Sequence, residues 1–294
     1  MTASLLDDLR PLVHRFRLGR FDVTTILDGT AYRDGLAPHF GIDQPADSVT
    51  DLAAASQLPQ HGFESSFTPT LVNTGNELVL FDTGNGAPRR PSGAGYLRER
   101  LHLAGYRPED IDIVAFTHVH PDHIAGVREG DQLAYPNARY VIGRHEFDAW
   151  SSGTTVPERR KDSRDLFIRL IPPLAETMTF LEDGDDVVSG IRVLATFGHS
   201  PGHLAYLVES DGHGLLIWGD LANHYVLSLE RPDWHVALDD DRALAAATRR
   251  RVLDMVATDR LLAAGHHMPF PAVGYVARAG HGFRWLPMTY QLRV

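Results

Sequence analysis

The chain has 294 residues, 43% of them hydrophobic, and a formal net charge of −10 at pH 7. This length and apolar content are sufficient for a large buried core, and we expect a single domain over residues 1–294. The acidic balance argues against a nucleic-acid partner, and the absence of cysteine excludes disulfides and thiolate metal ligands.

No stretch of the sequence has the composition of a membrane span, and the first residues lack the features of a secretory signal. We therefore expect a cytoplasmic protein without membrane association, unless a leader has been removed. A basic run at residues 249–251 falls in a predicted helix and is expected on a solvated face.

Strand-like and helical segments alternate along the chain, as is typical of layered α/β proteins. Residues 23–27 and the following Asp28-Gly29 turn predict an opening hairpin. Residues 31–68 are rich in Pro, Gly, Asp and Ser. They predict an N-terminal excursion that has no long strand and one short helix near residues 48–56.

Further helices are expected at residues 95–103, 144–150, 158–170 and 243–258. The helix at residues 158–170 should stop before two consecutive prolines. The acidic run at residues 239–241 precedes the last helix, where carboxylates favour the positive end of the helix dipole.

Three histidines and an aspartate are crowded together just after the apolar strand predicted at residues 111–116: His118, His120, Asp122 and His123. Alternate side chains that leave a strand point to one side, so His118 and His120 can bind one ion. The turn at Pro121 directs the next two ligand-type residues toward a second ion. The spacing therefore predicts a two-metal site, against the alternative of a histidine-rich polar loop.

No single loop can surround two ions about 3.5–4 Å apart, so further ligands are expected on other strands. Three later predicted strands end in such residues: His199, Asp220, and the adjacent His266 and His267. Each of these alone is also an ordinary loop or strand-end residue. Imidazoles and carboxylates together suit Zn, Mn, Co or Fe(II), whereas a calcium site would be built of oxygen ligands.

The order of these residues along the chain resembles the metallo-β-lactamase superfamily, and the similarity covers most of the sequence. The resemblance implies an αββα sandwich with the metals at the edge where loops meet. It also implies two ligand sets: His118, His120 and His199 for one ion, and Asp122, His123 and the last histidine for the other. Asp220 would bridge the two ions.

Within the superfamily, the segments at residues 16–21, 71–75, 80–84 and 283–287 look most like the methyl parathion hydrolase group and its lactonase relatives. In that group the last ligand precedes a hydrophobic residue and a short Pro/Ser-Phe-Pro turn, which selects His267. The looser Gly-His pattern of the superfamily would select His266 instead.

Asp82 ends an apolar strand at residues 78–81 and opens a glycine-rich turn, for which turn chemistry alone is a sufficient explanation. The resemblance implies a different role, in which Asp82 supports a metal-bound group through a hydrogen bond without binding the ion.

The reaction implied is metal-assisted hydrolysis, with Asp122 and Asp220 as the catalytic carboxylates and Asp122 carrying a proton toward the leaving group. A small lactone or aryl ester is the expected substrate, two zinc ions are the expected cofactors, and a homodimer is the expected assembly. Organophosphate triester hydrolysis is the alternative. A di-iron redox protein on the same fold is more remote, and so is a binding protein that retains the site.

Three residues are candidates for the substrate pocket: Trp150, Asn223 and Tyr225. Acyl-homoserine lactonases of the superfamily often have a tyrosine three residues after the bridging aspartate. Here that position is Asn223, and Tyr225 follows two residues later. This departure weakens a strict homoserine-lactonase assignment.

Overall fold

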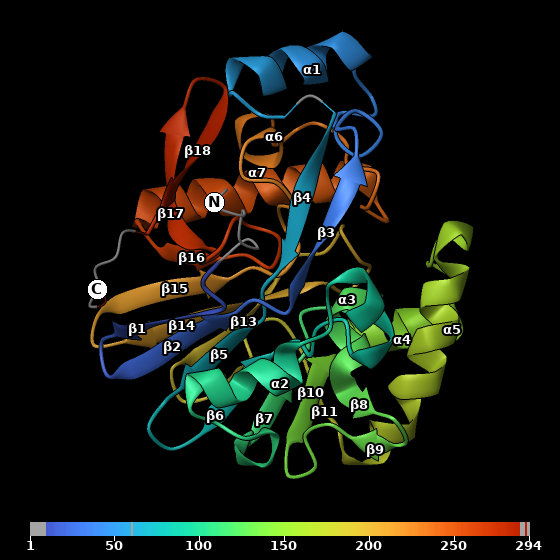
Figure 1. Ribbon diagram of the computed structural model, residues 1–294, viewed down its shortest axis with the longest axis vertical. Helices are drawn as coiled ribbons and strands as arrows, with labels where there is room; N and C mark the ends of the chain where they lie inside the picture. Colours follow the sequence, from blue (N-terminus) through green and yellow to red (C-terminus); the bar gives the residue numbers. More distant parts are fainter. Residues whose placement is uncertain (1–9, 60, 289–291, 293–294) are drawn as a thin grey trace, which may run out of the picture.

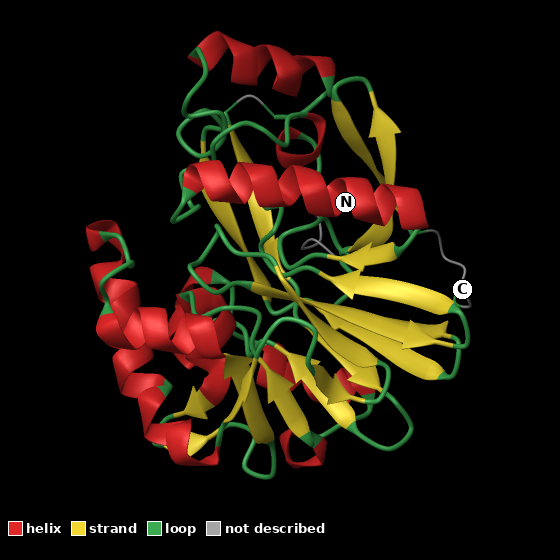
Figure 2. Ribbon diagram, turned by 180° about the vertical axis from the view of Figure 1, so that it is seen from behind, coloured by secondary structure: helices red, strands yellow, loops and turns green. Residues whose placement is uncertain are grey.

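The computed structural model describes residues 10–59, 61–288 and 292. Within this part, two seven-stranded sheets pack face to face and helices cover their outer faces (Figure 1, Figure 2). The layers follow the order α, β, β, α, so the expected αββα sandwich is confirmed.

The first sheet comes from the N-terminal half of the chain. Across the sheet its strands are β1 (Val13–Leu18), β2 (Phe21–Ile26), β5 (Thr70–Asn73), β6 (Leu78–Phe81), β7 (Ile113–Ala115), β10 (Arg139–Gly143) and β11 (Thr179–Leu181). Strands β6, β7, β10 and β11 run parallel. Their carboxyl ends therefore meet at one edge of the sheet.

The second sheet comes from the C-terminal half. Its strands are β12 (Asp186–Val188), β13 (Ile191–Ala195), β14 (Leu204–Ser210), β15 (His213–Ile217), β16 (Leu262–Ala264), β17 (Val273–Ala279) and β18 (Gly282–Pro287). Neighbours in this sheet are antiparallel except β15 and β16, which are parallel. Two short ribbons complete the strands: β3 (Gly29–Asp34) with β4 (Gly62–Phe67), and β8 (Arg128–Glu129) with β9 (Gln132–Leu133).

The helices lie outside the sheets and in the loops at their edges. The α-helices are α1 (Ala46–Ala55), α2 (Leu97–Arg100), α3 (Pro121–Ile124), α4 (Arg144–Ser152), α5 (Lys161–Leu170), α6 (Leu227–Glu230) and α7 (Arg242–Asp259). Short 3-10 helices are η1 (Ala87–Ser92), η2 (Leu101–Ala104), η3 (Pro108–Asp110), η4 (Ala125–Val127), η5 (Glu158–Arg160) and η6 (Pro172–Thr177). The helices expected after residue 95 are confirmed. None of the described helices combines the length and apolar composition that a bilayer span requires.

Strand β6 shows why the sequences of the central strands are continuous apolar runs. Leu78 and Leu80 pack under the helices on the outer face, whereas Val79 and Phe81 pack between the two sheets. A strand buried on both faces has no solvent side, so the usual alternation of polar and apolar residues is lost.

The expected hairpin at Asp28-Gly29 is wrong, because β2 pairs with β1 and β5 while β3 pairs with β4. The chain turns instead after β1, at Gly19 with φ +56°. The buried Asp28 carboxylate accepts hydrogen bonds from the backbone N–H groups of Gly95 (3.0 Å) and Leu97 (2.8 Å). These distant donors hold the chain at the end of β2 and direct it out of the sheet.

The excursion at residues 31–68 contains the expected short helix, which is α1. It has no long strand, as expected, but β3 and β4, of six residues each, form a two-stranded ribbon that the sequence did not predict. Strand β4 is hydrogen-bonded to the segment that follows β16, since Ser66 donates through Oγ to the Met268 carbonyl at 2.6 Å. The ribbon therefore lies against the segment that carries the last histidines.

Candidate metal centre

Two groups of histidines and carboxylates meet where strands of both sheets end: His118, His120 and His199, and Asp122, His123, Asp220 and His267. The histidine motif follows β7 of the first sheet and enters α3. The other residues follow β13, β15 and β16 of the second sheet. The structure thus brings together every residue that the sequence placed in the two ligand sets.

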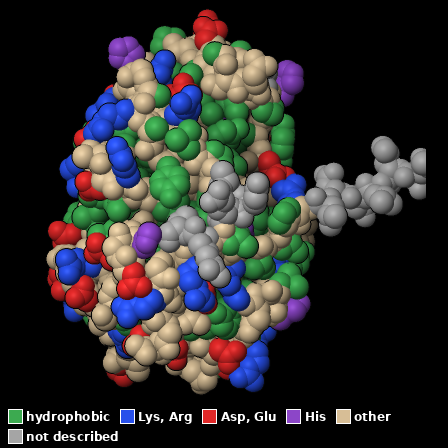
Figure 3. All heavy atoms as spheres, turned by 90° about the vertical axis from the view of Figure 1, so that its left-hand side faces the viewer, with side chains coloured by type: hydrophobic (Ala, Val, Ile, Leu, Met, Phe, Trp, Pro, Cys, Tyr) green, Lys and Arg blue, Asp and Glu red, His purple; other side chains and the backbone are tan. Residues whose placement is uncertain are grey.

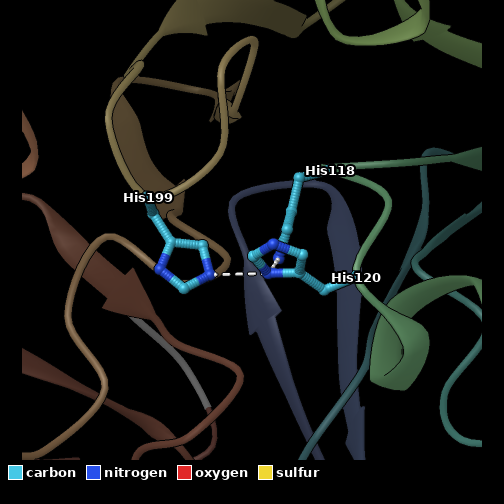
Figure 4. Close-up of side chains that lie close together, drawn as sticks. All are labelled: His118, His120 and His199. Carbon is cyan, nitrogen blue, oxygen red and sulfur yellow. Dashed lines mark hydrogen bonds between the residues drawn. The ribbon is translucent and has the colours of Figure 1, made fainter. Parts of the chain in front are cut away.

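The first group has three imidazole nitrogens directed at one point (Figure 4). His118 Nε2 lies 2.9 Å from His120 Nδ1, which lies 3.0 Å from His199 Nε2. Burial, together with the neighbouring His123 and His120, holds the pKa of His118 well below its ordinary value. Burial and then Arg160 lower the pKa of His120 to about 3. Both rings are therefore neutral at pH 7 and keep a lone pair, which is what a metal ligand requires.

The second group is organised by the Asp220 carboxylate, which reaches both groups. Its Oδ2 lies 3.0 Å from His267 Nε2 and 3.2 Å from His199 Nε2. Its Oδ1 lies 3.2 Å from His123 Nε2. Asp122 Oδ2 completes the group at 3.4 Å from His267 Nε2. The Asp220 carboxylate therefore joins the two groups.

Unpartnered buried atoms provide a test of whether metals fit here. Within the described part of the chain, His123 Nε2 and Asp220 Oδ1 are buried 3.2 Å from each other, and neither makes a hydrogen bond of acceptable geometry. Leaving such atoms unpaired costs about 1–3 kcal/mol each, unless another group compensates. A divalent cation between nitrogen and oxygen donors provides that compensation, so the donor set fits two metal ions.

Protonation of His199 and His267 opposes metal binding at acidic pH. Burial lowers the pKa of His199, but the Asp220 and Asp239 carboxylates outweigh this effect and raise it to about 9. Burial also lowers the pKa of His267, but the Asp220 and Asp122 carboxylates outweigh this effect and raise it to about 9. An ion that binds must displace these protons, so metal affinity should rise with pH up to about that value.

Asp82 lies behind His123. Its carboxylate accepts hydrogen bonds from the backbone N–H and the hydroxyl of Thr117, both at 2.8 Å, and lies 2.8 Å from His123 Nδ1. Asp82 has φ +63°, a left-handed conformation that aspartate tolerates better than most residues. With its oxygens engaged in this way, Asp82 orients His123 and leaves Nε2 of that ring for an ion.

The two adjacent histidines have different surroundings. His267 Nδ1 lies 2.9 Å from the Ser66 carbonyl, so this nitrogen donates and Nε2 is left to face Asp220 and Asp122. His266 also lies near Asp82 and His123 in a third possible group. The oxygens of Asp82 already accept other hydrogen bonds, so the geometry favours His267 as the last ligand.

We expect His267→Ala to lose about one bound metal ion per chain, because one of the two ligand groups loses its imidazole. His266→Ala should keep both ions. Metal content after exhaustive dialysis, measured by mass spectrometry, checks both variants. The opposite pattern would make His266 the ligand.

Two carboxylates that sequence reasoning did not assign stand behind the first group. Asp239 Oδ1 lies 2.9 Å from His199 Nδ1, and its other oxygen accepts from Arg249 Nη1 at 3.2 Å. Asp240 Oδ2 lies 3.5 Å from His120 Nε2. Such carboxylates hold the tautomer and orientation of a metal-binding ring. The sequence did contain an indication of this role, because the start of one helix needs only one of the three consecutive aspartates at residues 239–241.

Arg249 corrects the expectation of a solvated basic run, because it is 0% exposed. Its guanidinium accompanies Asp239, a buried charge that needs a partner. Asp241 alone has the expected helix-start role, as its side chain accepts from the Leu244 N–H of α7 at 3.0 Å.

Replacing Asp239 with Asn should weaken binding of one metal ion by about 10–100-fold, because His199 loses its charged partner. Asp241→Asn is the matched control from the same acidic run, and it should affect metal affinity little. Competition titrations with a chromophoric chelator measure both. Equal affinities for the two variants would refute the role given to Asp239.

The backbone around Asp220 is held by residues that the sequence did not point to. His203 accepts from the Asp220 N–H through Nε2 at 3.1 Å and contacts Thr196 Oγ1 through Nδ1 at 2.7 Å. Gly219 has φ +52°, and a Cβ there would lie 2.8 Å from His203 Nε2. A side chain at position 219 would clash with His203, so glycine is required directly before Asp220 at the end of β15.

Buried Glu146 links the two histidine loops. It accepts from the Val119 N–H at 3.0 Å, the Gly202 N–H at 2.7 Å and the Ser200 hydroxyl at 2.5 Å. Val119 lies between two histidines of the first motif, and Ser200 follows His199. The loops from the two sheets are thus fixed to one side chain of α4.

Two cavities adjoin the centre. One of about 400 Å³ is lined by residues of both groups, among them His120, Asp122, His199 and Asp220. The other, of about 290 Å³, is lined by Asn223 and Tyr225 and shares His267 with the first. Asn223 also donates to Asp220 Oδ2 at 3.0 Å.

Trp150 lies elsewhere, in the core under the first sheet with 0% exposure. Its indole N–H donates to Ser200 Oγ at 3.0 Å, and its ring packs edge-on against His120. Trp150 therefore packs against His120 from the core and lines neither of these cavities.

Comparison with known proteins agrees with this geometry. The chain is 27% identical to an N-acyl homoserine lactonase of Bacillus cereus over 157 residues, 53% of this chain and 56% of that protein. It is 28% identical to the mouse metallo-beta-lactamase domain-containing protein 1, over 66% of this chain and 61% of that protein. The chain thus spans a little over half the length of these curated relatives.

Solved structures match over nearly the whole chain. AidC, described as a dizinc quorum-quenching lactonase, superposes with a TM-score of 0.88 at 25% identity, covering 95% of this chain and 98% of AidC. The hydrolase AbOPH, described as a member of the beta lactamase superfamily, superposes with a TM-score of 0.89 at 26% identity, covering 97% and 100%. Residues 68–266 match the Metallo-beta-lactamase superfamily. By sequence match, by fold and by the arrangement of its histidines and carboxylates, this chain belongs to that superfamily.

Proposed function

We propose that the chain is one metal-dependent hydrolase domain that opens a lactone or an aryl ester. The observation that carries this proposal is the position of Asp220, within 3.2 Å of His199 of the first group and of His123 of the second. The lactonase described among the relatives and the lactonase AidC support the choice of substrate class.

In this proposal, one ion would be held by His118, His120 and His199 and the other by Asp122, His123 and His267. Asp220 would contact both ions. Zinc is the first candidate, and Mn, Co or Fe would suit the same donors. When bound, the two ions supply a nucleophile from water near neutral pH and polarise the carbonyl group under attack.

The chain's own side chains orient the reactants. Asp122 is only partly buried, with 22% of its side chain exposed on the cavity, and is the proposed carrier of a proton toward the leaving group. The cavity beside His267 is lined by aromatic side chains that include Phe63, Tyr225 and Phe270. These rings suit the apolar acyl or aryl part of the substrate.

A substrate panel tests the proposal. The metal-loaded protein is assayed with an acyl-homoserine lactone, dihydrocoumarin, an aryl ester and methyl parathion, each beside a chelator-treated control. We expect chelator-sensitive turnover of the lactones or the aryl ester that exceeds the triester rate by a wide margin.

Other results would select the alternatives. Faster triester turnover would assign organophosphate hydrolysis, since both reactions use the same centre. Bound iron with oxygen-dependent activity would indicate a redox protein, and two bound metals without any turnover would indicate a binding protein. The homodimer is part of the proposal, and light scattering coupled to size-exclusion chromatography tests it.

A further inference from the structure

Three arginines from separate parts of the chain line the 400 Å³ cavity over the metal centre: Arg33 of β3, Arg89 of η1 and Arg169 of α5. Arg33 is half-buried, and the other two are exposed. Within the described residues, none of the three guanidinium groups makes a hydrogen bond or an ion pair. Their convergence on one cavity is not explained by pairing within the fold.

The charge balance of the chain makes this arrangement unusual. The formal net charge is −10, and basic and acidic side chains are interspersed on the face that Figure 3 shows. Many arginines elsewhere have carboxylate partners, as Arg90 has Glu129 at 2.9 Å. Arg33, Arg89 and Arg169 have no such partner among the described residues, and all three line this one cavity.

The carboxylates on the cavity wall do not neutralise these arginines. Among the described lining residues they are Asp122 and Asp220, which the proposed function assigns to the metal ions. A fourth lining arginine, Arg160, is already paired, because its Nε donates to Asp240 at 2.8 Å. With the ions bound, the charged groups of the cavity wall would sum to a net positive charge.

We propose that this cavity recognises an anionic group on the substrate, so that the preferred substrate is a lactone or ester that carries a carboxylate or a phosphate. The inference rests on the proposed function, and Arg33, Arg89 and Arg169 are its specificity-determining residues. The planar guanidinium group matches the two oxygens of either anion and stays charged at all physiological pH values. The aromatic cavity on the other side of His267 would take the apolar part of the same molecule.

A matched set of substrates tests the inference. One lactone is prepared with a carboxylate, with a phosphate monoester and with a neutral carboxamide at the same position. For the wild-type protein, kcat/KM for at least one anionic form should exceed that of the carboxamide by about tenfold, the value of one good charge-assisted contact. The better of the two anions identifies the group.

The variant Arg33→Gln/Arg89→Gln/Arg169→Gln should lose this preference, because its kcat/KM falls by about tenfold for the anionic lactones and by much less for the carboxamide. Arg284→Gln, at an exposed arginine of β18 outside the cavity, is the control and should keep the preference. Because the three guanidinium groups make no hydrogen bond or ion pair within the described residues, the melting temperature should stay unchanged. Equal rates for all three lactones in the wild type, or an unchanged preference in the triple variant, would overturn the inference.

A binding measurement separates this inference from the proposed function. Calorimetric titration of the metal-loaded protein with glutarate should show about tenfold weaker binding to the triple variant than to wild type and Arg284→Gln. If no lactone or ester is hydrolysed, the proposed function fails, and arginine-dependent glutarate binding still supports the anion site. Equal glutarate affinity in all three proteins would refute it.

Discussion

Replacing Asp220 with alanine is expected to lower kcat/KM by about 10²–10⁴-fold and to release bound metal. Asp220 is 2% exposed and lies between His199, His123 and His267, so its removal leaves three buried imidazoles without their common partner. Breaking a buried charged contact of this kind costs about 3–5 kcal/mol, and each 1.36 kcal/mol is a factor of ten in rate. Steady-state kinetics and metal analysis on the same sample measure both effects.

Asp165→Ala is the matched control, because Asp165 is an exposed aspartate of α5. It should keep metal and activity. An Asp220→Ala variant that keeps two ions and wild-type turnover would show that the carboxylate does not bridge the groups, and the proposed mechanism would then be wrong.

Removing the metals is expected to lower the melting temperature by roughly 8–16 °C. A ligand present at a thousand times its dissociation constant stabilises the folded state by about 4 kcal/mol, and each kcal/mol is worth roughly 2–4 °C in a chain of this size class. The physical reason is local. Without ions, the buried rings of His118, His120 and His199 face one another with nitrogens about 3 Å apart.

Differential scanning calorimetry before chelation, after chelation and after zinc is restored measures this effect. The Asp220→Ala variant provides the control, since a protein that no longer binds the ions should show little change on chelation. A wild-type melting temperature that is insensitive to chelator would contradict a metal centre in this position.

The ligand residues could be predicted from sequence because each belongs to a short local pattern. An apolar strand followed at once by a polar residue at a glycine or proline turn identifies the strand end, as at His118 after β7 and Asp220 after β15. Parallel strands deliver such ends to one edge of a sheet. The helices α4, α5 and α7 were predictable for a similar reason, since their periodicity and end signals are local.

The errors concern residues whose partners lie outside the short pattern that predicted their role. Asp28 reads as a turn residue, yet its carboxylate binds backbone groups at residues 95 and 97. Arg249 reads as solvated, yet it accompanies Asp239 in the interior. Trp150 reads as a pocket residue, yet it packs in the core.

The sequence by itself determined the layered α/β class and the strand ends that carry histidines and carboxylates. Only the tertiary structure decided how these ends support one another. It placed Asp239 behind His199, 40 positions away, and set His267 rather than His266 toward Asp220. It also gathered three unpaired arginines around one cavity. Local patterns reflect backbone geometry over a few residues, whereas these pairings depend on how two sheets pack, which no short stretch of sequence encodes.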